Sequence, residues 1–305
     1  MAVLLSALQT ALPVLLALAL GMLCRKKSIL TKASVDVLKR IVIDITLPAV
    51  LLDAFATAQY DRSAIIIPGI MFAVCCLALV MGFGITKLLG LGKLPAFLAT
   101  GFEAGMLGYA LFVLLFPNES SSHFAIVDLG QVVFVNTVYK ILLTGEGDKK
   151  DILRGIVRSP IIWSIVIGVI LGATGLYNAM TKLGVSSLLD ALTSFIAAPT
   201  GMIILLVIGF DLNLGEIKWK DVFSLVSMRI VIMAVLLILV LALNKYVLDG
   251  MMHTGAVILM FLLPPPYMLP IFSTDESQSV RLSSAISALT LVTMILFAVL
   301  AAAIA

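Results

Sequence analysis

Long apolar segments alternate with short polar or Gly/Pro-rich breaks along almost the whole chain. A helix of about 20 apolar residues is long enough to cross a bilayer. We therefore expect an all-α integral membrane protein with ten transmembrane helices. Their predicted ranges are 2–24, 33–57, 64–86, 94–117, 122–144, 156–177, 184–211, 220–244, 251–273 and 279–304.

Prolines interrupt the ninth segment, which reads VILMFLLPPPYMLPIFS over 257–273 and contains Pro264, Pro265, Pro266 and Pro270. Proline has no N–H, so the carbonyls four residues before each proline lose their helical donor. Lipid cannot satisfy these carbonyls, and the break must face protein or a wet cavity. A broken helix at membrane depth points to a transport site. The alternative is a kinked helix that packs on its neighbours and binds nothing.

The fourth segment contains TGFEAGMLGYALF, in which Gly101, Gly105 and Gly108 weaken the helix and permit close helix crossing. Glu103 lies about nine residues into this segment, and ionisable residues inside a membrane are costly and therefore functional candidates. The alternative for the glycines is close packing alone. We expect the fourth and ninth helices to be broken and to cross each other.

The basic residues predict the orientation of the chain. Of the 20 Lys and Arg residues, all but Arg62, Lys182 and Lys245 fall in or beside the odd-numbered loops. Cytoplasmic loops carry an excess of Lys and Arg, so both termini are expected outside the cytoplasm and the protein in the plasma membrane.

The long polar segment 146–155 separates five predicted helices in 1–145 from five in 156–305. An odd number of helices in each half places the halves in opposite orientations, which is the inverted-repeat architecture of many secondary transporters. Two matched features support the repeat. Central prolines, Pro48 and Pro199, interrupt the second and seventh segments, and the fourth and ninth segments carry the breaks described above.

Other polar side chains fall inside predicted helices. Asp44, Asp128 and Asn136 either line a cavity or form internal hydrogen bonds, and Tyr267 follows the three prolines. We expect Arg229, about nine residues into the eighth helix, to reach the interface or, preferably, to pair with an acid.

Several function classes are disfavoured. The chain is 62% hydrophobic and only 12% charged, which leaves little mass outside the bilayer and indicates no nucleic-acid partner. Its three cysteines lack zinc or disulfide spacing, and no phosphate-binding loop, dinucleotide fingerprint or HExxH motif occurs. We therefore expect no enzyme, no cofactor and no bound metal, and we rank a membrane sensor or intramembrane enzyme low.

The motifs together resemble the auxin efflux carrier family, which includes plant PIN-type carriers and bacterial malate-type permeases. The resemblance lies in LPAVLL, EAGMLGYAL, DLGQVVFVNT, APTGMIILLVIGFDL and the Pro-rich ninth segment, in this order. The family's fourth-helix motif is similar to Gly-Asn-x-Gly-x-x-Gly-x-Pro. Gly105 and Gly108 match it, whereas Glu103 replaces the Asn and Ala110 the Pro.

This resemblance implies an inverted five-plus-five fold like that of NhaA-type antiporters and bile-acid transporters, with efflux or exchange of organic anions. We expect a secondary transporter of a small organic anion or weak acid, such as an auxin-like molecule or a dicarboxylate. The alternative is a sodium- or proton-coupled carrier of the same architecture. Glu103 would either repel an anion or hold a coupling proton. Membrane lipid surrounds the protein, and a homodimer is left open.

The residues expected to bind substrate or coupling ions gather on four segments. Those for substrate are Glu103, Gly105, Gly108, Asp128, Asn136, Pro264, Pro265, Pro266 and Tyr267, and those for a coupling ion are Asp44, Glu103 and Asp128.

The expected orientation predicts which loops are accessible from outside. In a variant without native cysteines, Lys149→Cys should resist a membrane-impermeant thiol reagent added to intact cells, because its loop is expected in the cytoplasm. Arg62→Cys, in an even-numbered loop, is the positive control. Labelling of Lys149→Cys from outside would contradict the orientation.

Overall fold

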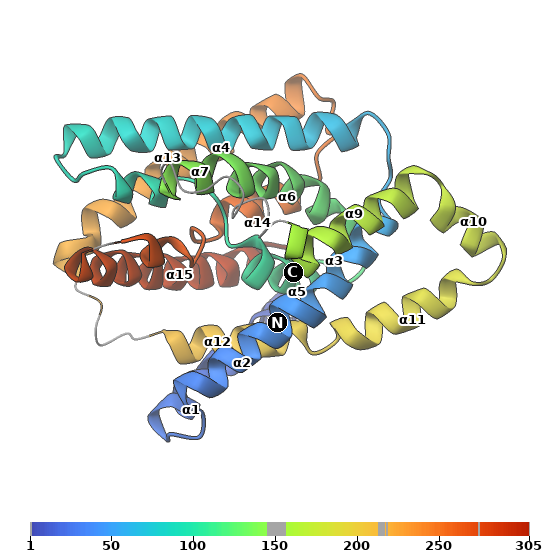
Figure 1. The fold of residues 1–305 in the computed structure, drawn as a ribbon, viewed down its shortest axis with the longest axis horizontal. Helices are drawn as coiled ribbons and strands as arrows, with labels where there is room; N and C mark the ends of the chain where they lie inside the picture. Colours follow the sequence, from blue (N-terminus) through green and yellow to red (C-terminus); the bar gives the residue numbers. More distant parts are fainter. Residues whose placement is uncertain (1, 145–156, 213–216, 218, 274, 305) are drawn as a thin grey trace.

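The computed structural model describes residues 2–144, 157–212, 217, 219–273 and 275–304, and this part of the chain is helical without a strand. The expected connecting segment 146–155 lies outside the described residues. Figure 1 shows long helices that run across the molecule and a bent hairpin, α9 to α11, that extends from one end. The predicted all-α class is confirmed for the described part.

The elements follow the expected segments closely in their order along the chain. They are α1 (Ala2–Lys26), α2 (Lys32–Ile41), η1 (Val42–Thr46), α3 (Leu47–Ala56), α4 (Ser63–Leu88), η2 (Leu94–Ala99), η3 (Ala104–Gly108), α5 (Tyr109–Leu115), α6 (Ser122–Phe134), η4 (Val135–Tyr139), α7 (Lys140–Thr144), α9 (Pro160–Ala173), α10 (Leu176–Lys182), α11 (Ser186–Ala197), α12 (Thr200–Asp211), α13 (Trp219–Tyr246), α14 (Thr254–Leu262), η6 (Leu269–Phe272) and α15 (Glu276–Ile304).

Within the described residues, six helical runs are long and apolar enough to cross a membrane, which indicates a membrane-embedded protein. They cover Ser63–Leu88, Leu94–Leu115, Ser122–Leu143, Ser186–Asp211, Trp219–Tyr246 and Glu276–Ile304.

A seventh candidate is bent. The helix predicted over 156–177 bends near its end, because α9 and α10 meet at 66°. Gly175 takes a left-handed φ of +72° between them, and its N–H bonds to the carbonyl of Gly172, so α9 cannot continue.

Prolines account for local irregularity in the second segment. Pro48 has no N–H for the carbonyl of Asp44, and the N–H of Leu47 bonds instead to the carbonyl of Val42, five residues earlier. The result is the π-helical turn η1 between α2 and α3.

The helices form two groups (Figure 1). In the first, α1 packs along α12, and α3 packs along α9 and α11. In the second, α4 contacts α6, η2 and α13, while α14 contacts α6 and α13. Glycines bring the helices of the first group close. A Cβ at Gly209 would lie 2.2 Å from the carbonyl oxygen of Leu18, and one at Gly168 would lie 2.9 Å from that of Leu52.

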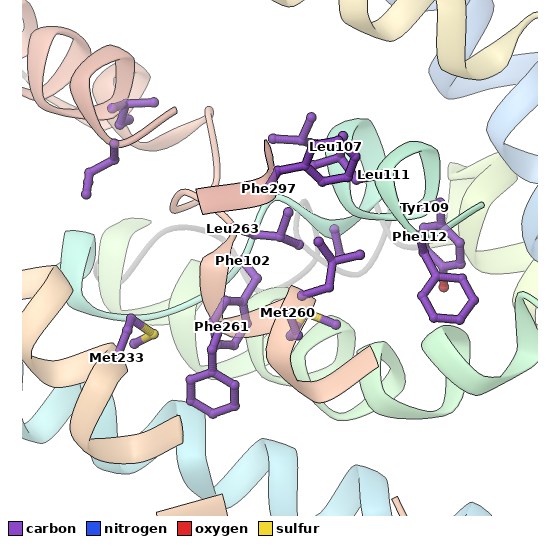
Figure 2. Packing of buried hydrophobic residues seen from close by; sticks show 14 of the residues in the cluster. Phe102, Leu107, Tyr109, Leu111, Phe112, Met233, Met260, Phe261, Leu263 and Phe297 are labelled. Carbon is purple, nitrogen blue, oxygen red and sulfur yellow. The ribbon is translucent and has the colours of Figure 1, made fainter. Parts of the chain in front are cut away.

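The fourth segment lies deepest in the core. In its most apolar 18-residue stretch 72% of the residues are buried, against 33% for Ser63–Leu88. Figure 2 shows Phe102 beside Phe261 and Leu263 of the ninth segment, and the Phe102 and Phe261 rings meet edge to face at 5.5 Å. The core therefore surrounds the two interrupted segments.

Candidate functional site: the crossing of two broken helices

The fourth segment is interrupted at Thr100–Glu103, between η2 and η3. Gly101 has φ +69°, a left-handed conformation that favours glycine. A Cβ at this position would lie 3.0 Å from two ring carbons of Pro266. Gly101 therefore permits both the sharp turn and the close approach of the ninth segment. The predicted break in the fourth helix is present.

The ninth segment is interrupted at Leu263–Pro266, between α14 and η6. The protein supplies new donors for carbonyls that the prolines deprive of theirs. The carbonyl of Met260 accepts from the N–H of Leu263 at 3.2 Å, and that of Leu262 accepts from the hydroxyl of Thr293 at 2.5 Å. The expectation that protein would pair these groups is met at both positions.

Glu103 joins the two breaks through three hydrogen bonds. Its backbone N–H donates to the carbonyl of Pro264 at 2.9 Å. Its carboxylate accepts from the N–H of Tyr267 at 2.8 Å and, over a longer 3.4 Å, from the N–H of Met106. The carboxylate thus lies where the helical parts after both breaks begin, and the free N–H groups there carry partial positive charge.

Arg229 of α13 binds the opposite side of the crossing. Its guanidinium donates to the carbonyls of Leu98 at 2.7 Å, Gly101 at 2.9 Å and Leu263 at 2.9 Å. The side chain is only 2% exposed, and its guanidinium carbon lies 5.6 Å from the centre of the Phe102 ring. A positive group thus pairs the carbonyls that both breaks leave free, while a negative group pairs the N–H groups.

The position of Arg229 corrects the sequence interpretation. It neither reaches the interface nor pairs with an acid among the described residues, because its partners are backbone carbonyls. The sequence shows an arginine within an apolar helix. It cannot show that the arginine binds backbone carbonyls, because every residue has one.

A buried polar chain approaches the crossing from α6. The amide of Gln131 bonds both the N–H and the carbonyl of Phe102, at 3.3 and 3.2 Å. It also donates to Asp128 at 2.9 Å, and Asp128 accepts from the hydroxyl of Tyr109 at 3.1 Å. The structure therefore brings Asp128 close to the crossing through Gln131, which contacts the backbone directly.

Two other candidate residues have no described contact with the crossing. The side chain of Asn136 donates to the carbonyl of Val132 and accepts from Lys140, both at the α6 to α7 junction. Asp44 is exposed on η1. Both predictions relied on the segment and the depth of the residue, whereas the rotation of a helix about its axis decides which groups a side chain contacts.

The remaining candidates lie at the crossing. Gly108 packs closely, since a Cβ there would lie 2.8 Å from the side chain of Leu263 and 2.5 Å from that of Phe124. At Gly105 a Cβ would lie 3.3 Å from Leu47. Pro264, Pro265 and Pro266 are buried, and Tyr267 is partly buried with its hydroxyl 3.3 Å from that of Thr290.

One cavity reaches the crossing from the side of α2 and α15. This lysine-lined cavity has a volume of about 490 Å³. It is lined by Lys32, Lys39, Met106, Val207, Ile208, Asp211, Leu212, Tyr267, Met268, Pro270, Ser283, Ile286, Ser287 and Thr290. Met106 and Tyr267 donate the N–H groups that Glu103 accepts, so the cavity ends at the crossing.

A second cavity, also about 490 Å³, is lined mainly by α1, α3, α5, α11 and α12. This aspartate-lined cavity is bounded by Pro13, Ala17, Val50, Asp53, Tyr109, Ala110, Val113, Leu114, Ser121, Thr193, Ser194, Ala197, Ala198, Thr200, Gly201, Met202 and Leu205. The two cavities share no lining residue, and they meet the fourth segment three residues apart, at Met106 of η3 and at Tyr109 of α5.

Among the described residues, no group of three or more His, Cys, Asp or Glu side chains is arranged to hold a metal ion. The chain matches no family model, and no curated protein matches it. Membership of the auxin efflux carrier family therefore stays a prediction that depends on the motifs quoted above.

The contacts of Arg229 predict a large loss of stability on its removal. Arg229→Met should lower the free energy of unfolding by about 3–9 kcal/mol, at about 1–3 kcal/mol for each of three carbonyls left unpaired. Arg229→Lys should lose less free energy of unfolding than Arg229→Met but still be less stable than the wild type, because an ammonium group cannot reproduce the planar fork of the guanidinium. Denaturant or thermal unfolding in detergent measures both.

The matched control is Arg281→Met, since Arg281 is only partly buried and donates to one carbonyl, that of Asp221, in an exposed position. We expect a change within about 0.5 kcal/mol there. Equal losses at Arg229 and Arg281 would contradict the bracing role.

Gly101 offers a second test of the crossing. Gly101→Ala and Gly184→Ala both force alanine into a left-handed conformation, at φ +69° and +73°, which costs roughly 1–2 kcal/mol. Only Gly101 has a neighbour, Pro266, within 4 Å of the added Cβ; nothing lies that close at Gly184. Gly101→Ala should therefore lose about 1–3 kcal/mol more than Gly184→Ala in the same unfolding assay. Equal losses would show that the close approach of Pro266 is not needed.

Proposed function

We propose that this protein is a secondary transporter of a small organic anion or weak acid, which binds at the crossing and moves by alternating access. The observation that carries this proposal is a pair of cavities that share no lining residue, one of which is lined by Met106 and Tyr267 beside Glu103. Discontinuous helices with free backbone groups at a midplane are a common design for such sites.

The charges of the lysine-lined cavity favour an anion. Asp211 contacts Lys39 at 2.6 Å and Lys32 at 3.2 Å, so one carboxylate is shared between two ammonium groups. Lys32 also lies 3.6 Å from Asp36, which does not line the cavity, so the lining itself, with Lys32, Lys39 and Asp211, carries one excess positive charge that favours anions. Further in, Ser283, Ser287 and Thr290 offer hydroxyl groups on α15.

We further propose ten membrane spans arranged as two inverted five-helix repeats. The helix contacts support this, because exchanging the halves maps one set of contacts onto another. The first segment packs on the seventh through α1 and α12, and the sixth packs on the second through α9 and α3. The third packs on the fifth through α4 and α6, and the eighth on the tenth through α13 and α15.

The orientation follows from the same proposal. Lys32 and Lys39 belong to the first loop region, which the distribution of basic residues assigns to the cytoplasm. The lysine-lined cavity then opens to the cytoplasm and the aspartate-lined cavity to the outside of the plasma membrane. A substrate anion enters from the cytoplasm and meets the crossing at Tyr267.

Glu103 sets the condition for anion binding. Its carboxylate already accepts the N–H groups of Met106 and Tyr267, which are the donors that a substrate carboxylate needs. An ionised Glu103 therefore competes with an anion, and a protonated Glu103 admits one. This exchange couples anion movement to a proton.

The second candidate is a sodium- or proton-coupled carrier of the same architecture in which the acids bind the coupling ion directly. It is favoured by two acids, Glu103 and Asp128, that interact electrostatically near the crossing. Counterflow of a labelled dicarboxylate in proteoliposomes, compared with sodium-driven uptake, distinguishes the two. Exchange that needs no sodium supports the first candidate, and uptake only with a sodium gradient supports the second.

The proposal predicts a change in pH dependence on neutralising Glu103. Wild-type anion counterflow should fall as pH rises, because ionised Glu103 repels the substrate. Glu103→Gln keeps one acceptor oxygen, so we expect a folded protein whose counterflow no longer depends on pH. The control is Glu119→Gln, at an exposed residue beside His123, which should keep the wild-type profile. An unchanged profile in Glu103→Gln would rule out Glu103 as the coupling group, and a failure to fold would favour a structural role.

A further inference from the structure

The aspartate-lined cavity has one charged residue, Asp53 of α3, among the described residues that line it. Asp53 is partly buried, and its carboxylate has no hydrogen-bond partner in the described part of the chain. Asp190 of α11 adds a second negative charge that repels it, and Asp190 is itself bonded by the hydroxyl of Tyr177 at 2.8 Å. Among the described residues, the charges at this cavity are therefore negative.

Thr200 is a second polar residue of the lining. It is 4% exposed, and its hydroxyl oxygen is buried and has no hydrogen-bond partner in the described part of the chain. Buried hydroxyl groups are normally paired, because an unpaired one costs free energy, so this side chain can turn toward the cavity without breaking a hydrogen bond. Thr193 and Ser194 of α11 also line the cavity. The hydroxyl of Thr193 donates to the carbonyl of Leu189. Its oxygen can still accept.

The rest of the lining is apolar or small. It consists of Pro13, Ala17, Val50, Tyr109, Ala110, Val113, Leu114, Ala197, Ala198, Gly201, Met202 and Leu205, with Ser121 at one side. Such a wall suits a hydrocarbon body, and a cavity of about 490 Å³ has the size of a small-molecule site.

We propose that the aspartate-lined cavity binds an organic ammonium ion with a small apolar body, with the ammonium group donating to Asp53 and, once the Thr200 side chain turns into the cavity, to its hydroxyl. Asp53 and Asp190 disfavour an anion as a bound ligand here, which is compatible with the release of a transported anion through this cavity but not with its binding there. A bare metal cation is disfavoured because the mostly apolar wall cannot replace a hydration shell of six or more oxygens. An ammonium group needs fewer acceptors, and its body is desolvated favourably by the wall.

This site is separate from the crossing. Tyr109 forms the boundary, since its ring lines the cavity while its hydroxyl donates to Asp128 behind it. The inference therefore does not depend on an anion being the transported substrate, and a binding assay without transport tests it.

The experiment uses three probes of nearly equal shape: benzylammonium, benzyl alcohol and benzoate. Isothermal titration against the purified full-length protein in detergent should show benzylammonium binding at least ten-fold more tightly than either of the others. Asp53→Asn should abolish that difference, and Thr200→Val should weaken benzylammonium binding several-fold without loss of stability, because its hydroxyl has no partner to lose. Asp61→Asn, at an exposed loop acid, should change nothing.

Equal binding of the three probes, or no binding of benzylammonium, would overturn the proposal. So would benzylammonium binding that Asp53→Asn and Thr200→Val both leave unchanged, since the ligand would then occupy another site. If Asp53→Asn does not fold, the Thr200→Val variant and the comparison of the three probes still test the proposal.

Discussion

Backbone groups that lose their helical partners inside an apolar medium must be paired by other parts of the protein, and the architecture depends on this constraint. Two segments break at the same place. Arg229 binds carbonyls from both breaks, and Glu103 accepts N–H groups that follow both. Each charge lies at the backbone groups of opposite polarity, so the crossing is stable without a ligand and remains polar enough to bind one.

The surrounding helices can be understood by what they bring to this crossing. Helix α13 supplies Arg229, α15 supplies Thr293 for the carbonyl of Leu262, and α6 supplies Gln131 for the backbone of Phe102. Helices α6 and α13 belong to the group around α4, and α15 contacts both α13 and α1 of the other group. The other group, around α1 and α12, provides the opposite walls of both cavities. A relative movement of the two groups would expose the crossing to one cavity at a time, which is the movement that the proposed transport requires.

The sequence predicted the helical class, the order of the segments and the two interruptions, because prolines and glycines act locally on the backbone. It also identified Glu103 as a residue of the crossing. It did not predict the bend at Gly175, whose left-handed φ is only one of the conformations open to glycine. It misjudged the partners of Arg229, and it did not separate Asp128, which reaches the crossing through Gln131, from Asn136, which bonds along its own helix. Depth can be inferred from position in a segment, whereas side-chain partners depend on packing between segments distant in sequence.

A double-mutant cycle between Glu103→Ala and Arg229→Met tests most directly whether the two charges hold one crossing. The two side chains share no hydrogen bond, yet both bind the fourth and ninth segments. If the crossing opens as a unit, the double variant should lose less free energy of unfolding than the sum of the single variants, with a coupling of at least about 1 kcal/mol. Losses that add to within about 0.5 kcal/mol would show two independent contacts and would contradict the account.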